Sequence, residues 1–145
     1  MVAFASKSAD TSRTNNTIAD DPHLLFTSVA AGRYGFIMAG RITCGSVTPG
    51  FKIGFKSSVT PNMSGTFMAF YTAGSGSLQR DSDEWVTSPG GIAYTTSAGT
   101  NIVCFHVQGF IDIPSTSNLT VMWAQSTTNA TAVVLKQGSY CALLS

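Results

Sequence analysis

The chain has 145 residues, a formal net charge of +1 and only 10% charged residues, against roughly 25% in ordinary soluble domains. This length fits one domain with a substantial core. The eight basic residues are scattered, so the basic stripe of a nucleic-acid binder is absent, and no apolar run approaches the ~18 residues of a membrane-spanning helix. A near-neutral surface with so little charge favours association with copies or partners.

Residues 1–20 are predicted to form an extended N-terminal arm. After two early apolar residues the segment is a polar run that has almost nothing to bury and cannot fold alone. It either frays or becomes ordered by lying on a neighbouring subunit, with Val2, Phe4 and Ile18 as its apolar anchors. The start of the chain lacks the pattern of a signal peptide, so we expect residence in a reducing cytosol or release from it by lysis. Residues 21–145 are predicted to be the folded domain.

Alternating apolar and polar residues predict strands in the first half of the domain, at 23–30, 34–42, 51–56 and 66–71. The segment 66–71 carries apolar groups on both faces, which is typical of a strand covered by the opposite sheet and by a neighbour. Phe67 and Tyr71 are therefore candidate interface residues.

Residues 72–91 are predicted to be a long loop, because Gly and Ser are followed by a cluster of charges and then by Pro89-Gly90-Gly91. Loops of this length are often binding surfaces. Trp85 lies within it without periodic partners. It either caps the edge of the domain or anchors a neighbouring subunit, since Trp is enriched at interface centres.

The second half predicts a weak strand at 92–96, a long strand at 102–113 and closing strands from 119 to 144. In the long strand Phe105 and Val107 should face the core, His106 should point outward, and Gly109 should mark a bulge or bend. Trp123 is expected in the core. With little sign of helix, the chain is predicted to be all-β, with about eight strands spaced for a sandwich, barrel or jelly roll.

The sequence lacks the patterns of known catalytic and cofactor sites. His23 and His106 lie far apart, and nucleophile-elbow, phosphate-loop and zinc-ligand spacings are all missing. The acidic residues at 81–84, and the pair Asp20-Asp21, are expected to be ordinary surface groups instead of calcium ligands. The three cysteines, at wide spacing, are expected to be small buried hydrophobes. We therefore expect no enzyme activity, no cofactor and no metal.

Two parts of the chain are similar to small virion proteins of tailed bacteriophages. At the front, the resemblance lies in Asp20-Asp21-Pro22-His23-Leu24-Leu25-Phe26 and in the following Tyr34-Gly35-Phe36. At the C-terminal end it lies in Leu119-Thr120-Val121-Met122-Trp123-Ala124-Gln125 and in Gly138-Ser139-Tyr140 before the closing strand. The resemblance covers most of residues 18–145.

This resemblance implies a jelly-roll-like sandwich that is usually trimeric and is carried on capsids as decoration protein or on tails as a fibre module. One domain with an arm suits the first placement. We therefore expect a capsid decoration (cement) protein on the virion surface, assembled in the host cytoplasm as a homotrimer. It would bind the major capsid protein at capsomer junctions, without nucleic acid or membrane. The alternative is a tail-fibre or receptor-binding knob that contacts the host surface through residues 72–91.

Overall fold

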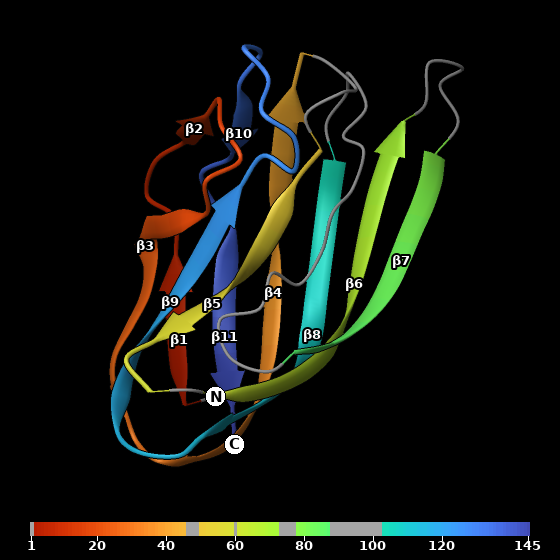
Figure 1. Cartoon of the computed structure of the whole chain (residues 1–145). Helices are drawn as coiled ribbons and strands as arrows, with labels where there is room; N and C mark the ends of the chain where they lie inside the picture. The colour runs from red at the N-terminus through yellow and green to blue at the C-terminus, as the bar shows by residue number, and fades with distance from the viewer. Residues whose placement is uncertain (1, 46–49, 60, 73–77, 88–102) are drawn as a thin grey trace.

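The computed structural model describes residues 2–45, 50–59, 61–72, 78–87 and 103–145, with backbone alone for 67, 69–72, 78–87 and 103. These residues form eleven strands in two sheets that pack face to face as a β-sandwich (Figure 1). The prediction of an all-β sandwich is confirmed, with more strands than the eight expected. No helix in this part of the chain is long and apolar enough to cross a membrane.

The two sheets differ greatly in size. The large sheet contains β1 (Ala3–Ser6), β2 (Thr11–Arg13), β4 (Gly32–Cys44), β6 (Asn62–Thr72), β7 (Leu78–Thr87), β8 (Val103–Ile113), β10 (Val133–Leu135) and β11 (Tyr140–Leu144). The small sheet contains β3 (Ala19–Val29), β5 (Lys52–Ser57) and β9 (Ser117–Ala124).

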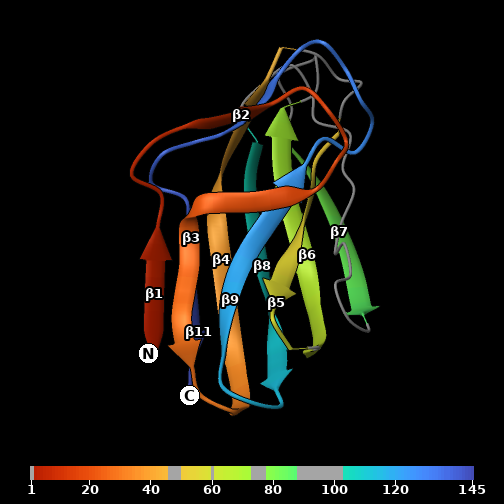
Figure 2. The ribbon, with the colours of Figure 1, turned by 60° about the vertical axis from the view of Figure 1, so that its left-hand side comes forward.

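Strands from the two halves of the chain alternate across both sheets, all in antiparallel pairs. In the large sheet β1 lies beside β11, β11 beside β4 and β4 beside β8, while the small sheet has the order β3-β9-β5. This interleaving is the strand order of a jelly roll, in which long connections cross from one sheet to the other. The two termini consequently lie side by side at one end of the sandwich (Figure 2).

The core lies between the sheets and is rich in aromatic rings. Trp123 of β9 is fully buried, and its ring centroid lies 5.7 Å from that of Phe51. Phe36 of β4 meets Phe55 of β5 edge to face at 5.0 Å, so this pair joins the large sheet to the small one. The prediction that Trp123 belongs to the core is confirmed.

The N-terminal residues do not form the predicted arm. Strand β1 pairs with β11, and β2 pairs with β10, so both are part of the large sheet. The predicted boundary at residue 20 falls inside β3, which begins at Ala19. The polar composition misled the prediction, because these residues bury little apolar surface themselves and are held mainly by backbone hydrogen bonds and by the buried side chains of Ala5 and Lys7.

Lys7 carries its charge into the interior and meets Asp21 there. Lys7 is 2% exposed and Asp21 1%, and the Lys7 Nζ donates a 2.6 Å hydrogen bond to Asp21 Oδ2. The Trp123 Nε1 donates to the same oxygen at 3.0 Å. The other carboxylate oxygen accepts from the backbone N–H groups of His23 at 3.0 Å and Leu24 at 3.2 Å. Every oxygen of this buried carboxylate is therefore bonded, which is the condition for a buried charge to be tolerated.

The predicted loop at 72–91 is largely a strand. Residues Leu78–Thr87 form β7, which pairs with β6 at the edge of the large sheet and places Trp85 opposite Gly65. The cluster of charges suggested a loop, but charged residues are also common on edge strands, where they discourage pairing with other chains. Residues 73–77 and 88–91, and the predicted strand at 92–96, lie outside the described residues.

Gly109 was expected to mark a bulge or bend, and the bulge is contradicted, because the pairing of β8 runs without interruption past it to both neighbours. The reason for a glycine is instead the close approach of β6. A Cβ on Gly109 would collide with the Ser64 carbonyl oxygen, and one on Gly65 would collide with the Gln108 carbonyl oxygen. Two facing glycines therefore allow the backbones of β6 and β8 to come together.

We expect Asp21→Asn to lower the free energy of unfolding by about 3–5 kcal/mol, because it leaves the Lys7 charge buried without a counter-charge. Urea unfolding would measure this loss. The matched control is Lys56→Ala, which breaks the exposed pair with Asp20 at 3.0 Å and should cost less than about 1 kcal/mol. Equal losses in the two variants would contradict the structural role of the buried pair.

Stability should also fall in acid through Asp21. Burial alone would raise the pKa of this carboxyl, but the hydrogen bonds from Lys7, His23 and Trp123 and the Lys7 charge together lower it below the ordinary value. A lowered folded-state pKa stabilises the protein above the unfolded value of about 3.9, and this contribution is lost as pH falls through the folded pKa. Urea midpoints measured from pH 6 downward should therefore decline less steeply for Asp21→Asn than for the wild type.

Candidate functional site

The small sheet covers one face of the large sheet, and no described element covers the other, which we call the outer face. Side chains alternate along each strand, so the buried Phe36, Met38, Phe105 and Val107 point toward the small sheet. Their sequence neighbours on β4 and β8 point away from it. His106 is one of these neighbours, so its predicted outward orientation is confirmed.

Because paired residues lie side by side, the side chains of the outer face form rows that run across the strands. One row crosses β1, β11, β4, β8 and β6 through Phe4, Ala142, Ile37, Gln108 and Thr66. The next row crosses β11, β4, β8 and β6 through Leu144, Gly35, Phe110 and Ser64. Apolar side chains therefore lie together on this face although they come from distant parts of the sequence.

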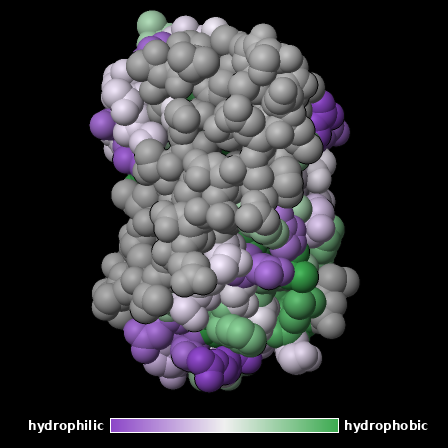
Figure 3. Space-filling view, turned by 90° about the vertical axis from the view of Figure 1, so that its right-hand side faces the viewer, coloured by the Kyte–Doolittle hydropathy of each residue, from purple (hydrophilic) through white to green (hydrophobic). Residues whose placement is uncertain are grey.

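Large hydrophobic side chains on this face are exposed to an unusual degree. Phe110 is 56% exposed and Phe4 53%, and Val2 beside it is 50% exposed. The Phe4 ring of β1 stacks on the Tyr140 ring of β11 at a centroid distance of 5.6 Å. Seen from the β7 edge, described hydrophobic residues gather low on one side of the molecule, next to hydrophilic residues at its lower end (Figure 3).

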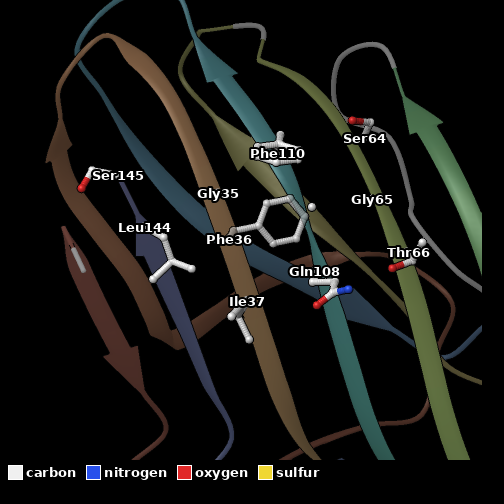
Figure 4. Close-up of a pocket in the computed structure, with 11 residues that line it drawn as sticks. Gly35, Phe36, Ile37, Ser64, Gly65, Thr66, Gln108, Phe110, Leu144 and Ser145 are labelled. Carbon is white, nitrogen blue, oxygen red and sulfur yellow. The ribbon is translucent and has the colours of Figure 1, made fainter.

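An open hollow of about 670 Å³ lies in the outer face across β11, β4, β8 and β6. In it, Gly35 separates Leu144 from Phe110, so the row has a gap one side chain wide (Figure 4). A Cβ added at Gly35 would make only ordinary contact, 3.6 Å from the Leu144 Cβ. The hollow is lined mainly by carbon, with polar groups from Ser64, Thr66 and Gln108 on one side and from Ser145 on the other (Figure 4).

Charges on the described part of the outer face lie toward the ends of its strands. Arg33 and Asp112 form an ion pair at 3.3 Å, and the Arg33 guanidinium lies 5.6 Å from the Phe110 ring centroid. Eight residues further along β4, Arg41 lies opposite Cys104. Between these two rows the strands β1, β11, β4 and β8 carry no Lys, Arg, Asp or Glu on this face.

The structure brings together only some of the predicted interface residues. Val2 and Phe4 belong to the outer face region, whereas Ile18 is half-buried just before β3 on the small sheet. Phe67 and Tyr71 lie on β6, and Trp85 lies on β7, opposite Gly65. Val2 and Phe4 were predicted as anchors on a neighbouring subunit through a free arm, and they instead lie on the surface of the chain's own sheet.

Sequence reasoning missed Ile37, Phe110 and Leu144. A signal was available, because β4 and β8 each carry apolar residues on both faces of the strand, as the segment 66–71 does. Only the register shows that these residues meet. The expectation for the cysteines was wrong at Cys104, which is exposed, while Cys44 and Cys141 are buried.

The two acidic groups Asp20 and Asp21, considered as possible cation ligands, are both engaged in ion pairs. Asp20 pairs with Lys56 on the surface, as expected. The expectation of a surface group was wrong for Asp21, which is 1% exposed and pairs with Lys7 in the interior. Within the described ranges no three His, Cys, Asp or Glu side chains come together as a metal site would require. His23 and His106 lie on different sheets.

Comparisons with known proteins add little. No protein-family model matches the chain, and no curated protein matches it significantly. Among solved structures, the CBM22-1 xylan-binding domain from Paenibacillus barcinonensis Xyn10C is similar with a TM-score of 0.34 and 12% identity, over 99% of this chain and 94% of that chain. A similarity this low carries no argument about function.

Proposed function

We propose that this chain is a structural protein of a tailed-bacteriophage virion, and specifically a capsid decoration (cement) protein. It binds the major capsid protein on the outer shell and stabilises the junctions between capsomers. It acts by burying surface and catalyses nothing. The observation that carries the proposal is the exposed, largely apolar centre of the outer face of the large sheet.

Burial of this face supplies the driving force for assembly. Each Å² of apolar surface removed from water contributes about 25 cal/mol. Phe4 and Phe110 are both more than half exposed on one sheet face. Exposed apolar patches of this kind mark interaction sites. The jelly-roll strand order and the low charge fit the same role.

The folded N-terminus changes how such a protein would bind. An arm that clamps a neighbour is no longer needed, because Lys7 fixes residues 3–13 to the chain's own core. The contacts with other subunits are made instead by the outer face, which β1 extends at one edge. Within the proposal, this surface joins copies of the chain to one another, and the rest of the sandwich remains available to the shell.

Imaging of purified virions that carry the labelled protein tests the proposal. We expect many copies spread over the capsid and none concentrated on the tail. Shells that lack the protein should open at lower temperature, and addition of the purified protein should restore them. A few copies at the tail tip would contradict the proposal and favour a receptor-binding knob.

A further inference from the structure

We infer that the outer face is covered by another copy of this chain, with Phe110 of one copy seated over Gly35 of its neighbour. This inference deepens the proposed function, on which its biological setting rests, by naming the surface that joins the subunits. Three properties of the outer face support it, namely its shape, its charge and its area.

The shape of the face provides both halves of a contact. Phe110 stands 56% exposed on β8, and the adjacent position on β4 is Gly35, which has no side chain. Leu144 closes the far side of the gap (Figure 4). A projecting ring and a space for a ring thus lie side by side, so two copies of the same surface can fill one another. Self-complementarity of this kind is what a two-fold contact between identical subunits requires.

The charge pattern favours an identical partner over a charged one. The ion pair between Arg33 and Asp112 is complete within the chain, and both side chains lie at the border of the hollow instead of over it. A partner rich in charge would have to lose its hydration against Ile37, Leu144 and Phe110 without finding opposite charges there. Around its own hollow, a second outer face brings mainly apolar and neutral groups to this surface.

The area of the face is large enough for a specific contact. Five strands from β1 to β6 span four spacings of about 4.8 Å, or about 19 Å. From the row of Arg33 to the row of Arg41 there are eight steps of about 3.3 Å, or about 26 Å. The product is about 500 Å² for each copy, and two faces reach the roughly 1,000 Å² that a specific interface needs.

The test is the mass of the purified full-length protein in solution, measured by light scattering or native mass spectrometry from micromolar to submillimolar concentration. The wild type should exceed its monomer mass of 15.2 kDa. Phe110→Asp should dissociate the assembly, raising the dissociation constant about thirtyfold or more, because it places a charge at the centre of the contact.

A second variant avoids the introduction of charge. Gly35→Phe fills the gap from within the chain, where a Cβ meets only ordinary contacts and the backbone is not strained. It should fold normally, as circular dichroism and the urea midpoint would show, and still weaken the assembly. The matched control is Leu25→Asp, since Leu25 is 45% exposed on β3 of the small sheet. This control should keep the wild-type mass.

The outcomes separate this inference from the proposed function. A dimer that both outer-face variants dissociate, and that the control does not, supports the inference. A wild type that is monomeric at every concentration overturns it, as does an assembly that ignores both variants. Occupation of the hollow by a small apolar molecule in a monomer would also overturn it. Failure of an assembled wild type to bind phage shells would count against the proposed function alone.

Discussion

A buried ion pair between Lys7 and Asp21 holds the N-terminal segment of this chain on its own core. The pair joins a lysine that follows β1 to a carboxylate at the start of β3, and Trp123 of β9 donates to the same oxygen. It therefore ties the N-terminal strand of the large sheet to two strands of the small sheet. Without Lys7, the buried carboxylate of Asp21 would lose its counter-charge, because no other cation among the described residues lies at hydrogen-bond distance from it. The N-terminal segment is a structural part of the sandwich for this reason.

Fixing that segment also determines which surface remains open. With β1 on the edge of the large sheet, Phe4 stacks on Tyr140 and extends the apolar outer face beyond β11. The small sheet has only three strands, and all of them pack on the opposite side. The same arrangement that completes the core therefore leaves a broad sheet surface with apolar side chains and little charge. Exposed apolar surfaces of this kind mark interaction sites.

Alternation along single strands was enough to predict the sandwich, the core position of Trp123 and the outward direction of His106. These features depend on one strand and its two faces. The outer face depends on register, since Phe4, Ile37 and Phe110 meet only because β1, β11, β4 and β8 pair in one order. Lys7 could not be recognised as buried, because its partner lies fourteen residues away on the other sheet. The charged edge strand β7 resembled a loop because edge strands and loops share their composition.

The central claim is that the outer face of the large sheet is an interface between copies of this chain. An experimental structure of the assembled protein, by crystallography or by cryo-electron microscopy of decorated shells, tests it most directly through the surroundings of one side chain. The account predicts that Phe110 is covered by a neighbouring copy and lies near that copy's Gly35. An assembly in which Phe110 faces solvent, or in which the subunits meet through the small sheet, would contradict it.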